Sequence, residues 1–378
     1  MTPHLRLALA HCRAHWGRTL ALAAAIALIA FVPLAARLAL SAAERQLTAR
    51  AEATPLVVGA RGAALDLVLN GLYFTDARPP MTRMAAAEAI WASGLADAYP
   101  LHVRFRVGQN PVVGATLDYF DFRGLRLAQG RGLAILGEAV LGAGAAQALA
   151  AGPGDAITTA PESLFDLGGV YPLRLRVVGV LAPTGGPDDA AVFVDIATAW
   201  VIAGVGHGHD PVAADPAGAV EAFVEITEDN IDSFHFHGDP AGFPVSLVIA
   251  APRDARSAAI LRGRYLDPAS ADQIFAPADS VAALLDRVFR VGRVLDAASA
   301  AMAAAAALAI AVAMRLAIRL RAPEFAALER MGAPRSTVLK LILAENVIVL
   351  SLAVIVLGVL FIPAARMADT LAFALVAQ

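Results

Sequence analysis

Cysteine and lysine are almost absent from this chain of 378 residues. Cys12 is its one cysteine, so an intramolecular disulfide is excluded. Lys340 is its one lysine, because the other 29 of the 30 basic Lys and Arg side chains are arginines. A Walker A loop needs a Gly-Lys pair, and Lys340 follows Leu339. The sequence therefore contains no P-loop, and if ATP drives this protein, we expect a separate subunit to hydrolyse it.

Signatures of enzymes and of nucleic-acid binding are also missing. The sequence has no HExxH motif, no CxxC motif and no Ser/His/Asp arrangement of a hydrolase. Its formal net charge is -3, and no basic face accompanies the acidic middle of the chain. We therefore expect neither an enzyme nor a nucleic-acid-binding protein.

Apolar residues are abundant and charge is unevenly distributed. Hydrophobic residues make up 58% of the chain and the mean hydropathy is +0.63, which indicates a membrane protein with a sizeable soluble part. Residues 41–293 hold 28 acids and 19 cations, a net charge of -9. The first eighteen residues hold Arg6, Arg13 and Arg18 and no acid. Since basic flanks stay in the cytoplasm, we expect a cytoplasmic N-terminus.

Three apolar segments are long enough to cross a bilayer. The first has eighteen uncharged residues, 19–36, and a cleaved signal peptide is the alternative, although its apolar region is usually only about 7–15 residues long. The predicted parts are an interfacial helix at 1–18, a first span at 19–40, an extracytoplasmic domain at 41–293, a second span at 294–314, a cytoplasmic loop at 315–340, a third span at 341–362 and a short tail at 363–378.

The predicted fold class is α+β, with three transmembrane helices and a mixed α/β domain between the first and second. Periodicity predicts helices at 84–93, 138–150 and 280–293, and strands at 101–107, 112–117, 173–181 and 191–195. The helix at 280–293 leads into the second span and would form a stalk. The glycines Gly142 and Gly144 indicate close packing rather than a phosphate loop, because no GxGxxG motif surrounds them.

The stretch between the second and third spans is rich in charge. Residues 315–345 carry six cations against three acids, as cytoplasmic loops of membrane proteins do. Phe325, Leu328 and Met331 recur at helical spacing, so residues 324–331 are predicted to form a short amphipathic helix. Such a helix at the membrane surface is suited to a groove on a cytoplasmic partner. The alternative is a solvated connector with no partner.

This stretch, EFAALERMGAPRSTVLKLILAE, resembles the loop after the second span of FtsX/MacB-like ABC permeases. The matching positions are Glu324, Ala327, Leu328, Arg330, Gly332, Ala333 and Glu345. The resemblance implies a coupling helix that meets a separate ABC ATPase subunit. The residues it assigns to ATPase coupling are Glu324, Phe325, Leu328, Arg330, Met331 and Gly332.

The same resemblance implies a wider assembly in the bacterial inner (cytoplasmic) membrane. The partners would be a second permease in a homodimer or heterodimer, two ATPase subunits, membrane lipid, and a periplasmic adaptor or lipoprotein. Such permeases relay ATP-driven motion to their external domain. The family also has a fourth span, whereas only residues 371–377 are apolar here, so we expect either a three-span variant or a truncated chain.

Two other functions stay open at this point. One is a regulatory scaffold that moves no substrate and acts on an extracytoplasmic partner such as a cell-wall hydrolase. A neighbouring gene for a hydrolase would favour this scaffold, and one for an adaptor or lipoprotein would favour transport. The other is a metal-responsive membrane receptor.

The metal hypothesis rests on two His-x-His pairs in the acidic region. They are His207 with His209 in GHGHD, and His235 with His237 in FHFHGD. Side chains two apart on a strand share a face, so each pair can offer two imidazoles to one ion. Imidazole suits divalent transition metals such as zinc. The alternative is that all four are solvated loop histidines.

Overall fold

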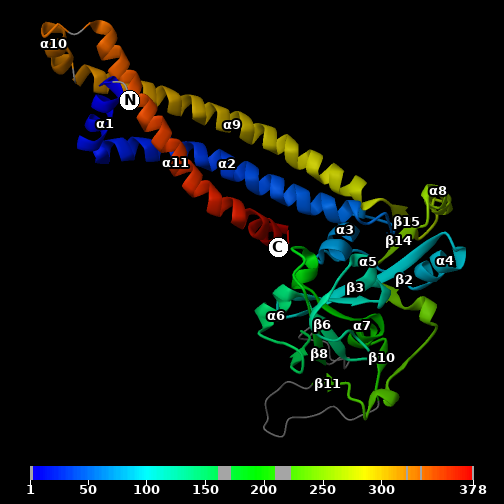
Figure 1. Cartoon of the computed structure of the whole chain (residues 1–378). Helices are drawn as coiled ribbons and strands as arrows, with labels where there is room; N and C mark the ends of the chain where they lie inside the picture. The colour runs from blue at the N-terminus through cyan, green and yellow to red at the C-terminus, as the bar shows by residue number, and fades with distance from the viewer. Residues whose placement is uncertain (1–2, 161–171, 209–222, 321, 333, 377–378) are drawn as a thin grey trace. The chain divides into compact units, whose positions relative to one another are not determined.

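The computed structural model describes residues 3–160, 172–208, 223–320, 322–332 and 334–376 (Figure 1). The chain divides into two compact units. A helical unit comprises Met1–Ala43 and Asp286–Ala372, and an α/β unit is formed mainly by Glu44–Leu285.

The described helical unit is formed by three long helices and two shorter ones. Its helices are α1 (Pro3–Ala14), α2 (Trp16–Glu52), α9 (Pro277–Leu320), α10 (Ala322–Arg330) and α11 (Arg335–Val376). Alanines of α1 and α2 meet apolar side chains of α11: Ala8 clusters with Leu341, and Ala23 clusters with Val349 and Ala353. Small residues let helix backbones approach closely, which is how helices associate in a lipid environment.

Two helical segments among the described residues are long and apolar enough to cross a membrane. They are Trp16–Ala39 and Ser336–Ala365, which overlap the predicted first and third spans. The predicted second span, 294–314, is helical within α9 but is not one of these two. The structure therefore supports two of the three predicted spans.

The ends of the long helices α9 and α11 differ from prediction. The α9 helix continues to Leu320, past the predicted start of the loop at residue 315. The α11 helix contains Pro363 and continues to Val376, whereas a separate tail was predicted from residue 363. Proline removes one backbone hydrogen bond and kinks a helix, but it does not always end one.

The α/β unit is built on a mixed sheet of eleven strands. Its order is β11-β8-β6-β9-β4-β3-β14-β1-β15, and β5 and β7 also pair with β8. The strands are β1 (Leu56–Ala60), β3 (Ala96–Val107), β4 (Asn110–Ala115), β5 (Leu127–Gly130), β6 (Glu138–Leu141), β7 (Ala156–Thr158), β8 (Leu173–Leu181), β9 (Val192–Asp195), β11 (Val224–Glu225), β14 (Leu247–Pro252) and β15 (Asp272–Phe275). Most pairs are antiparallel, and β4–β9, β6–β8 and β8–β11 are parallel. This mixed sheet confirms the predicted α+β class for the domain.

The described residues also form two smaller sheets of two strands each. One pairs β2 (Thr82–Arg83) with β13 (Pro244–Val245), and the other pairs β10 (Gly206–His207) with β12 (His235–Phe236).

Helices cover both faces of the main sheet. They are α3 (Ala64–Tyr73), α4 (Ala85–Ser93), α5 (Asp118–Arg123), α6 (Ala143–Leu149), α7 (Ile196–Ile202) and α8 (Ala255–Arg264). Along β14, Leu247 and Ile249 join the core that contains α3, while Val248 and Ala250 join the core that contains α4. Alternate residues of a strand point to opposite faces, so one strand contributes to two apolar cores.

The predicted helix at 138–150 is wrong in its first third. Residues 138–141 form β6, which lies between β8 and β9, and only Ala143–Leu149 is helical. Ala139, Val140 and Leu141 are fully buried, and ladder pairing on both sides outweighs the helix propensity of alanine.

The close packing predicted at Gly142 and Gly144 is confirmed. A Cβ atom at Gly142 would lie 2.1 Å from the backbone oxygen of Asp188. A Cβ atom at Gly144 would lie 2.9 Å from that of Asp189. The absence of a side chain at these glycines therefore allows two backbone segments to lie close together.

Candidate functional site

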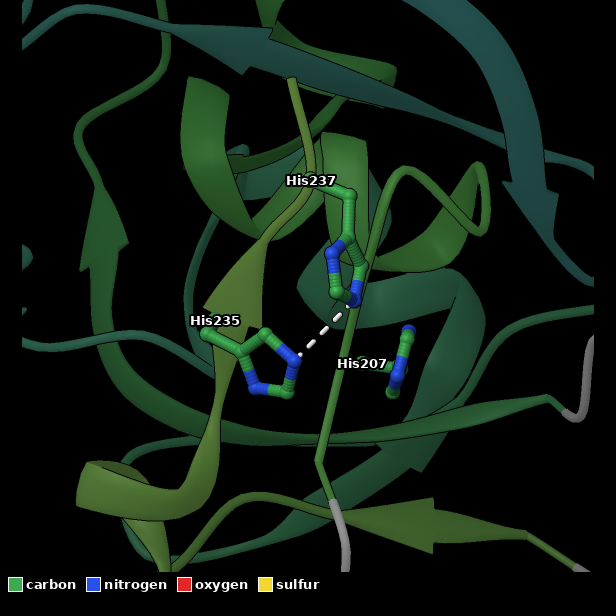
Figure 2. Close-up of side chains that lie close together, drawn as sticks. All are labelled: His207, His235 and His237. Atoms are coloured by element: carbon green, nitrogen blue, oxygen red, sulfur yellow. Dashed lines mark hydrogen bonds between the residues drawn. The ribbon is translucent and has the colours of Figure 1, made fainter.

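Three of the four predicted histidine ligands meet at one place. His207 lies on β10 and is the direct antiparallel partner of His235 on β12. His237 follows two residues later on the same side of the chain (Figure 2). His209 lies outside the described residues. The structure therefore brings together one complete His-x-His pair and half of the other.

The three imidazole rings face one another (Figure 2). Ring centroids are 4.9 Å apart for His207 and His235, 4.9 Å for His207 and His237, and 4.6 Å for His235 and His237. One ring nitrogen from each histidine lies within 4.8 Å of the other two. His207 and His237 are exposed and His235 is half-buried, so solvent reaches this histidine cluster.

Alternation of aromatic and histidine side chains positions the cluster. Phe234 and Phe236 pack against the apolar core, and Phe236 also makes an edge contact with Trp200 at 6.3 Å between ring centroids. Because side chains alternate along an extended segment, His235 and His237 are directed to the other side. The sequence pattern FHFH thus folds into an apolar face and an imidazole face.

Two glycines fix the position of His207 against this strand. A Cβ atom at Gly206 would lie 2.6 Å from the ring of Phe236, and one at Gly208 would lie 2.8 Å from the ring of Phe234. Only glycine permits this close approach without moving the aromatic rings. The GHG pattern therefore lets His207 come opposite His235.

Hydrogen bonds define the tautomer of His235. Its Nδ1 lies 3.1 Å from the carbonyl oxygen of Ser233, and a carbonyl only accepts, so Nδ1 carries the hydrogen of the neutral ring. The other nitrogen, Nε2, then presents a lone pair toward the cluster, 3.0 Å from Nε2 of His237. An imidazole nitrogen in this state is able to bind a metal ion.

The predicted coupling residues lie on α10 and in the turn after it. The structure describes the backbone of Glu324, Phe325 and Leu328 as helical but not their side chains. The helix ends at Arg330, one residue earlier than predicted, and the amide of Met331 donates to the carbonyl of Ala327 at 3.0 Å.

The residues at the end of α10 are open to solvent. Arg330 and Gly332 are exposed, and the side chain of Met331 is 76% exposed. Gly332 has φ +94°, a conformation that favours glycine, so it ends the helix as predicted.

A buried charged network in the α/β unit was missed by sequence reasoning. Arg50 donates to Asp188 and to the hydroxyl of Tyr119, and Arg123 donates to the hydroxyl of Thr54 at 2.9 Å. Burial is the largest single influence on Arg50 and opposes its charge, but the attraction of Asp188, Tyr119 and Tyr73 and the hydrogen bond to Asp188 together outweigh burial and raise the pKa of Arg50. Burial lowers the pKa of Arg123. No local pattern marks these residues, since Arg50 and Asp188 are 138 positions apart.

Three solved structures are similar to this chain at low identity. The periplasmic region of MacB from Actinobacillus actinomycetemcomitans has 13% identity and a TM-score of 0.37, covering 64% of this chain and 97% of that one. The extracellular domain of the noncanonic ABC-type transporter YknZ from Gram-positive bacteria has 12% identity and a TM-score of 0.33, covering 58% of this chain and 98% of that one. A domain of a putative permease protein from Porphyromonas gingivalis has 13% identity and a TM-score of 0.26, covering 51% of this chain and 77% of that one.

Comparison with curated proteins found no match. The family model described as the MacB-like periplasmic core domain matches residues 19–233, more than half of the chain. The matched segment includes most of α2 and most of the strands of the mixed sheet. The chain therefore belongs to the FtsX/MacB-like ABC transporter permease family, whose MacB-like periplasmic core domain it contains.

Proposed function

We propose that this protein is the membrane-spanning permease subunit of an FtsX/MacB-like ABC system. In this proposal it relays motion from a separate ATPase subunit to its extracytoplasmic α/β domain. The observation that carries the proposal is α9, one helix of 44 residues from Pro277 to Leu320. Its first residues belong to the α/β unit, and from Asp286 onward it belongs to the helical unit.

A continuous helix is suited to transmitting force. At 1.5 Å per residue, α9 is about 66 Å long. Its backbone hydrogen bonds lie along the axis, so displacement at one end is passed on rather than absorbed in a loop. The α2 helix, Trp16–Glu52, likewise has residues in both units. Two such helices support a relay between the membrane and the domain.

The proposed topology has three spans and a cytoplasmic N-terminus in the bacterial inner membrane. The two apolar helical segments, Trp16–Ala39 and Ser336–Ala365, support the first and third spans. The second span is proposed at residues 294–314 of α9. Arg330 is exposed between the second and third spans, Lys340 is exposed near the start of the segment Ser336–Ala365, and Arg6 and Arg13 precede the first span. By the positive-inside rule, these arginines and Lys340 favour the cytoplasmic side.

The proposed site of ATPase coupling is α10 with the turn after it. Phe325, Leu328 and Met331 recur at helical spacing, and Met331 is the member whose exposed side chain the structure describes. In this proposal the apolar residues enter a groove on the ATPase, while Glu324 and Arg330 contact its rim. The active assembly would be a permease homodimer or heterodimer with two ATPase subunits.

The experiment introduces charge on two sides of α10. Leu328→Asp is expected to abolish co-purification of the ATPase and stimulated ATP hydrolysis, because loss of an apolar anchor commonly costs about 2 kcal/mol or more. The matched control is Ala326→Asp, which places the same charge two residues away, outside the apolar face. Insertion of each variant is checked in the membrane fraction.

Selective loss of ATPase binding in Leu328→Asp would support the coupling assignment. If the ATPase co-purifies equally with the parent and with Leu328→Asp, α10 is not the coupling helix. If both variants detach the ATPase while inserting normally, the apolar face is not what the ATPase recognises.

A further inference from the structure

We propose that His207, His235 and His237 form a binding site for a divalent transition metal, with zinc as the ion that its chemistry fits. This inference goes beyond the proposed permease function and does not depend on it. The site also extends outside the matched family segment, which ends at residue 233. His235 and His237 both follow that residue, so the family match does not cover two of the three histidines.

The spacing of the ring nitrogens is close to that of a coordinated ion. Zinc binds imidazole nitrogen at about 2.0–2.1 Å, and two such ligands at a tetrahedral angle lie about 3.3 Å apart. The Nε2 atoms of His235 and His237 are 3.0 Å apart. Because a ring nitrogen of His207 lies within 4.8 Å of both, small side-chain rotations place all three around one ion.

The hydrogen bond from His235 matches the surroundings of known metal ligands. Metal-bound histidines usually donate their second ring N–H to a carboxylate, a backbone carbonyl or water, which fixes the ring and its tautomer. Nδ1 of His235 does this with the carbonyl of Ser233, at 3.1 Å. The half-buried member of the cluster is therefore held with Nε2 directed toward the other two histidines.

The pairing of β10 with β12 limits the conformational entropy that the histidines would lose when a metal ion binds. The pairing of His207 with His235 is set by the β10–β12 ladder. Phe236 anchors β12 in the core between Trp200 and Phe243, with ring centroids 6.3 Å and 5.9 Å away. Two of the three ligands thus lie on directly paired strands, and a preorganised backbone of this kind strengthens metal sites.

The donor set selects the class of metal. Three imidazoles favour zinc, copper and nickel over magnesium or calcium, which prefer oxygen ligands. The three described ligands fill three of the four tetrahedral positions, and solvent reaches His207 and His237. The surrounding region, residues 41–293, carries a net charge of -9, which also favours a cation.

The test is zinc binding by the full chain, purified without a polyhistidine tag. Titration calorimetry with zinc chloride and the zinc-induced shift in melting temperature are measured for the parent, for His207→Gln and for His237→Gln. Both histidines are exposed, so these changes should leave the metal-free melting temperature unchanged. The matched control is the double variant His11→Gln with His15→Gln, whose rings lie 4.7 Å apart on and just after α1.

We expect one zinc ion per chain, and an affinity at least tenfold weaker in each site variant, since loss of a supporting group alone costs 10–100-fold in such sites. The control variant should bind as the parent does. X-ray absorption at the zinc edge should give nitrogen ligands at about 2.0–2.1 Å, and this measurement needs no variant.

Three results would contradict the proposed zinc site. The first is absence of both binding heat and thermal shift in the parent. The second is equal zinc affinity in the parent and in the His207 and His237 variants. The third is evidence that zinc binds elsewhere, either as loss of binding in the control variant or as a sulfur ligand at about 2.3 Å. Either result would assign the ion to the segment that contains His11, Cys12 and His15.

Discussion

Arg50, in the last turn of α2, and Asp188, in the 3-10 turn Pro187–Ala190, form a two-point ion pair. Nη1 of Arg50 lies 2.5 Å from Oδ2 of Asp188, and Nη2 lies 3.0 Å from Oδ1. Their side chains are only 10% and 5% exposed. The guanidinium also lies 5.2 Å from the ring centre of Phe74. This pair fastens the end of α2 to the middle of the α/β unit.

Asp188→Asn should strongly destabilise the α/β unit. The substitution leaves the Arg50 guanidinium buried without its counter-charge, and breaking one side of a buried ion pair typically costs about 3–5 kcal/mol. Thermal or denaturant unfolding of the full chain, followed by tryptophan fluorescence, measures this loss. Asp97→Asn is the exposed control and should change the stability little.

A second comparison separates charge from packing at this pair. Replacing both partners with apolar residues, Arg50→Met with Asp188→Leu, should recover much of the stability lost in Asp188→Asn, because no buried charge remains unpaired. If Asp188→Asn unfolds at the parent's midpoint, Arg50 is not held as described.

Glu138 should make the domain sensitive to acid. Burial opposes its ionisation, but hydrogen bonds from Arg131, from the amides of Ala134 and Ile135, and from Arg176 outweigh that effect and lower the pKa of Glu138 to about 2. The ordinary value is 4.5. A lowered folded-state pKa contributes stability above the ordinary pKa, and this contribution is lost as the pH falls from about 4.5 toward 2.

The variant Glu138→Gln cannot ionise and therefore lacks this dependence. We expect it to be less stable than the parent at pH 7 and to converge with the parent as the pH approaches 2. Melting temperatures measured across this pH range make the comparison. Curves that stay parallel at every pH would show that Glu138 does not contribute to the acid sensitivity.

Parts of the fold follow directly from local sequence. Strands β8 and β9 were predicted to within one residue, because runs rich in valine and leucine between turns have few alternatives. The helix α4 was predicted equally well. The strand β6 was not, because its residues Glu138–Leu141 resemble the alanine-rich helix that follows, and only its two neighbouring strands make it extended.

Long-range relationships account for what local sequence could not predict. The HxH spacing predicts that His235 and His237 share a face, but the pairing of His207 with His235 depends on a ladder between strands 28 positions apart. The ion pair of Arg50 and Asp188 likewise depends on the tertiary fold. The glycines in GHG are a further local signal that the sequence-based prediction did not use, since a strand with alternating glycine indicates close approach of another segment.

The central claim is that the α/β domain and α10 lie on opposite sides of the membrane. Single cysteines are introduced in a Cys12→Ser background, at Ala89 in α4 and at Ala327 in α10, both of which are exposed. A membrane-impermeant maleimide is then applied to intact spheroplasts. We expect Ala89→Cys to be labelled at once, and Ala327→Cys only after the membrane is permeabilised. Labelling of Ala327→Cys in intact spheroplasts would contradict the topology and, with it, the proposed coupling to a cytoplasmic ATPase.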